Sequence, residues 1–429
     1  MAGSSIGNHF RITTFGESHG RAIGAVIDGV RPGLAVDLAF IQHELDRRRP
    51  GQSAVTTSRA EADQVEVLSG VFEGKTTGTP ICMLIWSKDQ RPEAYKRIKD
   101  MFRPGHAGYT YLAKFGVSDY RGGGRSSGRE TAARVAAGAF AKKLLAEQGI
   151  EIFAYTREAG GIRAKTVDPL EIERNVLRSP DAVAAKKMEA LILRMKRQGD
   201  SVGGIVEVVV KNAPPGLGEP VFDKLEADLA KALMSIGAIK GFEVGNGFAA
   251  ARLRGSQNND PIYFDKKLGR VRTRTNNAGG IAGGISNGED IVLRIAVKPP
   301  SSIRKKQETV TVNGESAVIS VEGRHDPCIC PRVVPVAEAM VAMTLFDHLT
   351  RQQLMVGAGA RKEVGRSLKM IDRNILLLLS EREALLQQKG DRARKKRKGG
   401  SAAPRISGAR ELGLKESYVE KVFRAIRAR

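Results

Sequence analysis

The segment that decides the fold is Gly24–Leu34, GAVIDGVRPGL, which leads into a helix expected over Leu38–Arg48. A β-branched run ends at a Pro-Gly turn and helical periodicity follows, so the segment predicts a strand, a turn and a helix. The same order returns in Gly204–Leu217, GIVEVVVKNAPPGL, before a helix expected over Phe222–Met234. Such a repeat indicates two halves of like topology.

A second pair of segments repeats in the same order. Ser69–Gly78, SGVFEGKTTG, precedes a strand expected over Ile81–Trp86. Gly279–Gly288, GGIAGGISNG, precedes one expected over Ile291–Val297. A site between the two halves would then be lined by both. Strand–turn–helix junctions are also common in unrelated proteins, so at this level the repeat has an alternative explanation.

The remaining patterns are both helical and strand-like. Further strands are expected at Phe10–Phe15, Ala22–Ile27, Val65–Leu68 and Ile205–Lys211. Further helices are expected at Arg129–Glu147, Ala182–Arg197 and Val336–Leu354. We therefore predict an α+β fold. One domain is expected over residues 1–356, with approximate halves 1–200 and 201–356, followed by a basic, partly helical or disordered extension over 357–429.

The composition is that of a globular protein without disulfide bonds. Hydrophobic residues make up 41% of the 429 residues, which is too high for a disordered chain. No stretch approaches the about 18 continuous apolar residues of a membrane span, and the N-terminus lacks a signal-peptide pattern. The cysteines, Cys82, Cys328 and Cys330, fit neither a disulfide framework nor a zinc spacing. We expect a cytoplasmic protein with no metal site and no membrane contact.

The net charge of +23 is unevenly distributed. From Arg361 onward the chain has 20 Lys and Arg against 8 Asp and Glu, so about half of the excess lies in one sixth of the chain. A basic tail raises the alternative of a nucleic-acid-binding protein. Aromatic residues are only 5% and no nucleic-acid-binding motif is present, so we expect such binding at most through the tail.

Three short loops concentrate Arg, His and Ser. They are Thr14–Gly20, TFGESHG; Asp46–Gly51, DRRRPG; and Arg103–His106, RPGH. Glycines allow a close backbone approach to a ligand, and Arg suits bidentate binding of carboxylate or phosphate. Each loop alone also fits a plain turn histidine or a solvated helix end.

The strongest local pattern is Tyr120–Thr131, YRGGGRSSGRET, at the start of a long helix. Three glycines, two serines and the free N–H groups of a helix N-terminus form an anion-binding cradle, which Arg125 and Arg129 reinforce. A plain flexible loop is the alternative. The pattern is neither a P-loop, because the G-K-[ST] ending is missing, nor a dinucleotide-binding fingerprint.

Two later segments have the same character. Lys298–Ser302, KPPSS, follows a strand with a cation and two hydroxyls, and Gly323–Cys328, GRHDPC, gathers a cation, an imidazole and a carboxylate. The residues alone therefore predict an enzyme for a small substrate with several negative charges, acting without metal or thiol.

In this order the segments resemble the chorismate synthase family over roughly residues 5–356. The resemblance rests on six collinear motifs: Phe15–Gly20, Asp46–Gly51, Arg103–His106, Gly122–Ser127, Gly216–Pro220 (GLGEP) and Gly323–Pro327. It implies a β-α-β sandwich of two sheet-bearing halves and a homotetramer. It also implies the anti-1,4-elimination of phosphate from 5-enolpyruvylshikimate-3-phosphate to chorismate. The reaction depends on reduced FMN without net redox change and ends the common pathway to the aromatic amino acids.

The resemblance also implies site residues. His106 matches the general acid toward the flavin, His19 with Ser18 acts near the leaving phosphate, and Asp326 with Ser127 is linked to proton removal. The flavin-binding positions are Arg125, Ser126, Ser127, Gly237, Ala238, Gly283, Lys298, Pro299, Pro300, Ser301, Ser302 and Arg324. The positions for substrate or NADP are Arg48, Arg49 and Arg129.

A few positions depart from the family pattern. Ala54 stands where a second anion-contacting arginine often lies, Gly237 replaces an Asn, and Gly128 replaces an Ala. These differences concern anion contacts rather than the reaction.

A different flavoenzyme, such as a reductase, is an alternative function. It would need an NAD(P)H site, and the fingerprint of such a site is missing. The sequence leaves open whether NADPH can reduce the flavin.

Overall fold

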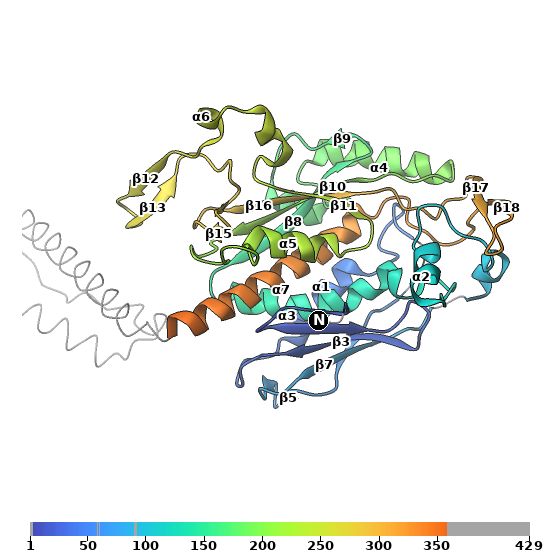
Figure 1. Ribbon diagram of the computed structural model, residues 1–429, viewed down its shortest axis with the longest axis horizontal. Coiled ribbons are helices and arrows are strands. Elements are labelled where there is room, and N and C mark those ends of the chain that lie inside the picture. The colour runs from blue at the N-terminus through green and yellow to red at the C-terminus, as the bar shows by residue number, and fades with distance from the viewer. Residues whose placement is uncertain (1–2, 58, 60, 90–91, 358–429) are drawn as a thin grey trace, which may run out of the picture. The chain divides into compact units, whose positions relative to one another are not determined.

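The computed structural model describes residues 3–57, 59, 61–89 and 92–357, and all of them except Gly357 belong to one unit, Met1–Val356 (Figure 1). The unit combines two five-stranded sheets with helices, so the predicted α+β class is confirmed. The basic extension predicted over 357–429 lies outside the described residues, apart from Gly357 at the end of the last helix.

The first sheet is antiparallel, in the order β1-β2-β3-β7-β4. Its strands are β1 (Ser5–Ile6), β2 (Arg11–Phe15), β3 (Ala22–Asp28), β4 (Val65–Val67) and β7 (Ile81–Trp86). Alternate residues point to opposite faces, so Ile23, Ala25 and Ile27 are buried against the helices. Gly24 lies on the other face, where an added Cβ would come within 2.5 Å of the Phe15 ring.

The second sheet is also antiparallel, in the order β9-β8-β10-β16-β11. Its strands are β8 (Glu151–Ala159), β9 (Ile162–Arg163), β10 (Gly204–Lys211), β11 (Ile239–Val244) and β16 (Ile291–Val297). In each sheet, the strand that precedes the Pro-Gly turn pairs with the strand that follows a small hairpin. These pairs are β3 with β7 in the first sheet and β10 with β16 in the second. Those hairpins are β5–β6 (Val71–Phe72 and Lys75–Thr76) and β14–β15 (Ile281–Ala282 and Ile285–Ser286).

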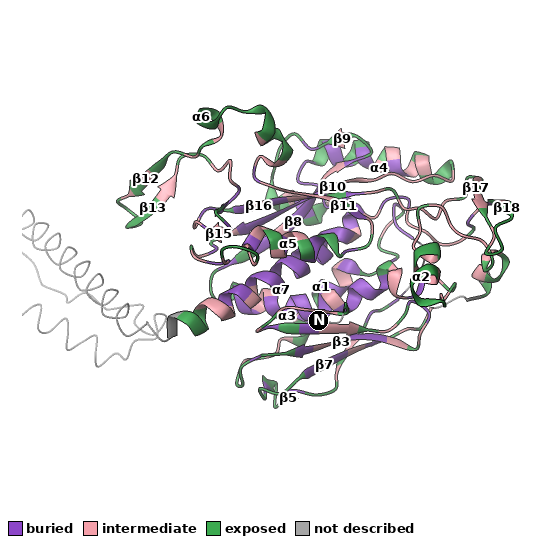
Figure 2. Ribbon diagram, in the orientation of Figure 1, coloured by how far each residue is buried: buried purple, intermediate pink, exposed green. Residues whose placement is uncertain are grey.

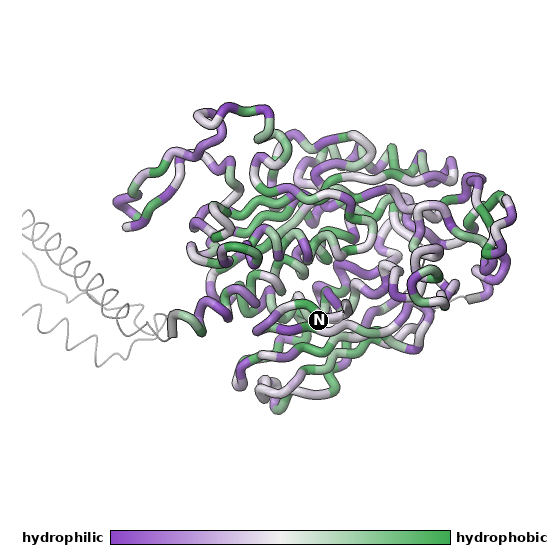
Figure 3. Tube along the Cα trace, in the orientation of Figure 1, coloured by the Kyte–Doolittle hydropathy of each residue, from purple (hydrophilic) through white to green (hydrophobic). Residues whose placement is uncertain are grey.

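A layer of helices separates the two sheets within this unit (Figure 1). It contains α1 (Leu38–Arg48), α3 (Thr131–Ala146), α5 (Leu225–Met234) and α7 (Cys330–Gly357). Figure 2 shows most of the buried residues in this layer and on the inner faces of the sheets, and Figure 3 shows apolar residues in the same places. Burial of this apolar surface is the main stabilising contribution to the fold.

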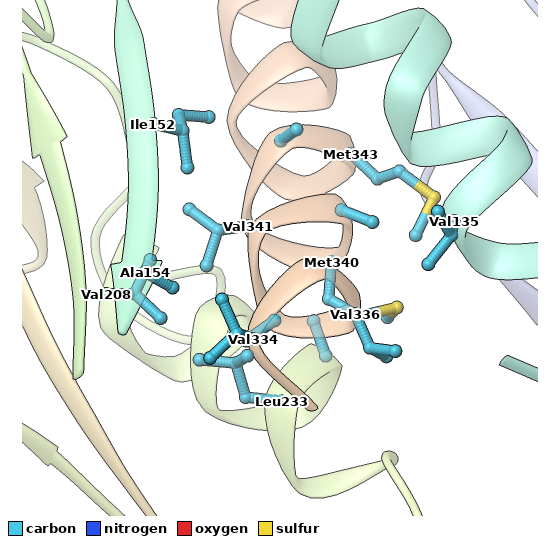
Figure 4. Packing of buried hydrophobic residues seen from close by; sticks show 14 of the residues in the cluster. Val135, Ile152, Ala154, Val208, Leu233, Val334, Val336, Met340, Val341 and Met343 are labelled. Carbon is cyan, nitrogen blue, oxygen red and sulfur yellow. The ribbon is translucent and has the colours of Figure 1, made fainter. Parts of the chain in front are cut away.

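Helix α7 is the centre of the core. Figure 4 shows Val334 and Val341 facing Val208 and Ile152 of the second sheet, while Val336, Met340 and Met343 lie toward α3. Gly138 of α3 touches α7, because an added Cβ there would come within 2.3 Å of the Ala339 Cβ. The two helices therefore pack at a spacing that only a glycine allows.

Helix α7 begins six residues before the predicted start at Val336. Pro335 has no N–H for the carbonyl of Pro331, and the Arg178 guanidinium donates to that carbonyl instead, at 2.7 Å. A proline inside a helix is tolerated here because a distant side chain replaces the missing hydrogen bond. This partner lies 153 residues away in the chain, so local patterns gave no sign of it.

By length and composition, Cys330–Met355 could cross a membrane, which the sequence reading did not anticipate. However, 83% of its apolar window is buried within the unit, so we interpret it as a core helix.

The predicted ranges of α1, α4 (Ala182–Arg197), β7 and β16 are confirmed. Strands β8 and β11 were missed, because both mix charged and apolar residues.

The remaining elements are short. They are the helices α2 (Gly108–Phe115) and α6 (Gly255–Asn258), the hairpins β12–β13 (Ile262–Asp265 and Arg270–Thr273) and β17–β18 (Gln307–Val310 and Ser316–Ile319), and the 3-10 helices η1 (Pro92–Ile98), η2 (Gly124–Ser126), η3 (Gly128–Glu130), η4 (Pro169–Arg174) and η5 (Gly247–Arg252).

Candidate active site

A cavity of about 1100 Å³ lies where the Arg-, His- and Gly-rich loops come together. The N-terminal ends of α3 and α7 both reach its wall, through Thr131 and Val333. The predicted site residues that line it are Ser18, Arg48, His106, Arg125, Ser126, Ser127, Arg129, Gly237, Ala238, Lys298, Pro300, Ser301, Ser302, Arg324 and Asp326. Loops from both parts of the sequence therefore form one site.

Four predicted site residues do not line this cavity. His19 is buried against Gly122, and Pro299 lines a smaller pocket of about 350 Å³. Arg49 is half-exposed, 3.9 Å from Asp46. Gly283 lies in the turn of the β14–β15 hairpin, with open space around it. Their assigned roles remain predictions.

The cavity is strongly basic. Among the described residues, eleven Lys and Arg side chains line it, against the two carboxylates of Glu130 and Asp326. Burial lowers the pKa of Arg103 and of Lys298, because desolvation disfavours their charged forms. An anion with more than one negative charge relieves this repulsion, so the cavity suits a multiply charged anionic ligand.

The glycine-rich cradle brings two histidines to this wall. Gly122 and Gly123 have positive φ angles of 65° and 96°, a conformation that glycine adopts without strain. A Cβ on Gly122 would lie 2.4 Å from Nδ1 of His19, and one on Gly123 would lie 2.9 Å from Nε2 of His106. Both glycines are required because the imidazoles touch the backbone.

His106 has a defined tautomer in its neutral form. Its Nδ1 accepts from the Gly108 N–H at 3.2 Å, so the proton lies on Nε2. Burial, followed by the charges of Arg103 and Lys298, lowers the pKa of His106 to about 3. At neutral pH the ring of the ligand-free protein is therefore an uncharged donor through Nε2.

His19 is held by its surroundings on several sides. Its ring meets the Tyr95 ring edge-on, with centroids 5.4 Å apart, and the Ser18 N–H donates to the Gly124 carbonyl at 3.1 Å. Within the described residues its Nδ1 is buried without a partner. Burial and then the charge of Arg59 lower the pKa of His19, so this ring is also neutral near pH 7.

Arg125 connects the cradle to β2. Its guanidinium donates to the Gly16 carbonyl at 3.1 Å and to the Thr14 hydroxyl at 2.8 Å. Both acceptors are neutral, so these contacts leave the charge of Arg125 uncompensated. The arrangement fixes the guanidinium while keeping its charge available to an anion in the cavity.

Asp326 is bound through both carboxylate oxygens. Oδ1 accepts from the Thr57 N–H at 2.8 Å, and Oδ2 accepts from Arg332 at 2.6 Å. Arg332 lies in the first turn of α7, and its Nε also donates to the Arg48 carbonyl at 3.3 Å. The orientation of this carboxylate therefore depends on the core helix as well as on its own loop.

Arg324 and His325, the neighbours of Asp326, also line the cavity. Arg324 pairs with Asp89 at 2.5 Å, and this bond raises the pKa of Arg324. Burial and the charge of Arg103 lower the pKa of His325 to about 4. Among the described residues, Nε2 of His325 is buried without a partner.

Several lining residues were missed by sequence reasoning. Tyr95 and Arg332 belong to no motif, and Arg103 lies in one of the motifs without a predicted role. Arg103 lies over the Tyr95 ring at 5.7 Å and donates to the Ser302 hydroxyl at 3.3 Å. Their positions depend on contacts between distant segments, so no local pattern could have identified them. Among the described residues no group of three His, Cys, Asp or Glu could hold a metal.

Comparisons with known proteins agree with this geometry. A family model described as chorismate synthase matches residues 10–350. The chain is 59% identical over 356 residues to the chorismate synthase of Methanosarcina mazei, covering 82% of this chain and 97% of that protein. It is 56% identical over 354 residues to that of Chloroflexus aurantiacus, with the same coverage.

A solved structure gives the same result. The crystal structure of a chorismate synthase superposes with a TM-score of 0.66 at 33% identity, covering 81% of this chain and 93% of the other. Both the matched length and the identity to curated relatives are far above what fold similarity alone would produce. The chain therefore belongs to the chorismate synthase family.

Proposed function

We propose that this protein eliminates phosphate from 5-enolpyruvylshikimate-3-phosphate to give chorismate. The observation that carries the proposal is the cavity that, in the described part of the chain, eleven basic side chains and two carboxylates line. The substrate has two carboxylates and a phosphate, and it would neutralise much of this charge. Each charge-assisted hydrogen bond to such a ligand contributes roughly 1.5–3 kcal/mol.

Chorismate synthases use reduced FMN, and the cavity wall is compatible with it. Ser126, Gly237 and Ala238 lie along one side, where a Cβ on Gly237 would meet nothing nearer than the Ser126 carbonyl, at 3.9 Å. This open, glycine-lined surface next to hydroxyls and Lys298 suits a planar ring and a phosphate. We assign the flavin to Arg125, Ser126, Ser127, Gly237, Ala238, Lys298, Pro300, Ser301, Ser302 and Arg324. When bound, reduced FMN supplies electron density that assists the departure of the allylic phosphate.

We assign the stabilisation of the leaving phosphate to Arg125, Ser18 and His19. The charge of Arg125 has no carboxylate partner in the described part of the chain. Negative charge builds on the phosphate oxygens as the C–O bond breaks, and fixed donors that need no reorganisation stabilise it. His19, buried against Gly122, would contribute its ring N–H in the neutral form.

We assign the donor near the flavin to His106 and the carboxylate that assists proton removal to Asp326. The neutral His106 ring donates through Nε2, and an anionic ligand would raise the pKa of His106 by opposing the charges of Arg103 and Lys298. Asp326 stays oriented through Thr57 and Arg332 while it assists the departure of the substrate proton.

The decisive experiment is anaerobic. The protein is mixed with reduced FMN and 5-enolpyruvylshikimate-3-phosphate, and phosphate and chorismate are measured together. We expect equal amounts of the two products over many turnovers, without flavin oxidation. Phosphate release coupled one-to-one to flavin oxidation would contradict the proposal and favour a reductase.

Variants separate the roles of the site residues. His106→Ala and Asp326→Ala are expected to keep FMN binding and to lose most of the turnover, by about 10²-fold or more. His43→Ala is the control, because His43 is exposed on α1. Wild-type turnover in either site variant would remove that residue from the mechanism.

We also propose that the protein is a cytoplasmic homotetramer. Phe15, Leu68, Phe72 and Trp86, on or beside the first sheet, are exposed apolar side chains that a neighbouring subunit would cover. Sedimentation equilibrium is expected to give four times the chain mass. A monomer at micromolar concentration would contradict this assignment.

A further inference from the structure

Two buried carboxylates lie directly behind the cavity wall, and no sequence motif marks them. Glu61 and Asp63 are two residues apart just before β4, and their side chains are 1% and 0% exposed. Ionised groups are rarely buried to this extent unless they are paired. The groups that pair with Glu61 and Asp63 therefore indicate what these carboxylates do.

Asp63 joins two arginines of the cavity. One oxygen accepts from Nη1 of Arg48 at 2.8 Å, and the other accepts from Nη1 of Arg129. Arg48 donates its remaining bonds to Thr131 at 3.2 Å and to the Gly128 carbonyl at 2.7 Å. One carboxylate thus holds two guanidiniums side by side at the start of the cradle helix.

Glu61 holds a third arginine, Arg59, in the same way. Its Oε1 accepts from Nη2 of Arg59 at 2.7 Å, and its Oε2 lies 3.9 Å from Arg129. The carboxylate also accepts from the N–H groups of Lys88 and Asp89, at 3.1 and 3.2 Å. Arg48, Arg59 and Arg129 all line the cavity, so the two carboxylates hold three of its cations from behind.

We propose that Glu61 and Asp63 are positioning residues, which fix Arg48, Arg59 and Arg129 in the register that the anionic substrate requires. This inference rests on the proposed function of the same cavity. Without the carboxylates the guanidiniums would repel one another and change rotamers, because a free arginine has many conformations. The charge of the wall would remain, but its geometry would be lost.

Two further observations support this role. Asp63 has a φ angle of 48°, a left-handed conformation that is uncommon for non-glycine residues, although aspartate adopts it more readily than most. Burial alone would raise the pKa of Asp63, yet Arg48 and Arg129 together hold it below the ordinary value. The carboxylate therefore stays ionised to a lower pH than a free aspartate would.

The test compares Asp63→Asn with Glu338→Gln. Glu338 is an equally buried carboxylate with two cations, Arg47 and Lys142, each at 2.6 Å, but it lies outside the cavity lining. It is thus a matched control for the loss of a buried ion pair without an effect on the cavity. Turnover, the KM of the substrate, binding of inorganic phosphate and thermal stability are measured for both full-length variants.

Asp63→Asn is expected to lower kcat by about 10²-fold, because misplacement of contact groups by about 1 Å has that effect. Its dissociation constant for inorganic phosphate is expected to stay within about threefold of the wild type, since the substitution removes none of the basic side chains that line the cavity. Glu338→Gln is expected to lose thermal stability but keep its kcat. Equal loss of kcat in the two variants, or wild-type kcat in Asp63→Asn, would overturn the proposal.

A measurement without turnover separates this proposal from the proposed function. Phenylglyoxal modifies guanidinium groups, and peptide mass spectrometry locates the modified residues. Arg48 and Arg129 are expected to react about tenfold faster in Asp63→Asn than in the wild type, and unchanged in Glu338→Gln. Unchanged reactivity of Arg48 and Arg129 in Asp63→Asn would refute the positioning role, regardless of which substrate the enzyme acts on.

If Asp63→Asn does not fold, Asp63→Glu replaces it. This variant keeps the negative charge but moves the carboxylate by one methylene group. Positioning predicts a folded protein with kcat lowered about tenfold. A folded Asp63→Glu variant with wild-type kcat would show that charge alone suffices, and would overturn the inference.

Discussion

Replacement of Gly123 by alanine tests the contact between the cradle and His106. The new Cβ would lie 2.9 Å from Nε2 and 3.1 Å from Cε1 of the imidazole, and 3.2 Å from the Ser126 hydroxyl. Ordinary contacts begin near 3.4 Å, so the ring would have to move by about 0.5 Å. Movement of a catalytic group on this scale lowers kcat by about ten- to a hundredfold.

The substitution also strains the backbone. Gly123 has a φ angle of 96°, and an alanine in such a conformation costs about 1–3 kcal/mol. Gly116→Ala is the matched control, because Gly116 ends α2 with a φ angle of 69° and an added Cβ there would meet nothing within 4 Å. Both variants should therefore lose stability, but only Gly123→Ala should lose turnover.

The assay combines anaerobic phosphate release with thermal unfolding of both variants. We expect a reduction in melting temperature of a few degrees for each, from the strain alone. A Gly123→Ala variant with wild-type kcat would refute the argument that the Nε2 contact is part of the site. Equal losses of kcat in the two variants would show that backbone strain, rather than the position of His106, matters.

Three further predictions concern charge. The low pKa of His106, about 3 against 6.5 in the unfolded chain, gives stability that is fully present above pH 6.5 and is lost as the pH falls toward 3. In urea titrations between pH 6.5 and 4.5, His106→Asn should therefore lose less stability than the wild type; parallel curves would contradict this. Arg125→Ala should raise the substrate KM by one to two decades, measured at saturating FMN, because one charge-assisted contact is lost; an unchanged KM would place Arg125 outside the substrate site. Deletion of residues 361–429 should leave kcat unchanged, because the lining residues lie between Gly3 and Val336; a loss of turnover would give the extension a catalytic role.

The sequence predicted the regular elements well where one physical rule dominated. The short apolar runs of Ile81–Trp86 and Ile291–Val297 led to correct strands, and alternate residues of each run are buried in the structure. Strand β8 was missed because Tyr155, opposite Glu207 in the ladder, belongs to a polar row that local hydrophobicity does not reveal. Periodicity predicts burial of single elements, and it does not predict which polar groups meet across a sheet.

The sequence also predicted part of the candidate site, namely the loops that line the cavity. Glycine, arginine and histidine loops such as Gly122–Ser127 indicated an anion site, because those residue types have few other uses in such density. Asp63 and Arg332 could not be predicted, since a lone carboxylate or guanidinium has no meaning until the fold brings its partner close. The motifs thus identified many of the groups that line the cavity, and the structure was needed to find the groups that hold them.

The arrangement of α3 and α7 has a consequence for how the cavity attracts anions. Both helices start at its wall, in contact through Gly138 and Ala339 farther along, and each N-terminus carries a partial positive charge of about one half. Together the two peptide dipoles provide roughly one full charge that no proton can remove. The attraction for a phosphorylated ligand therefore has a constant part, which alkaline pH cannot abolish and which no single side-chain substitution can delete.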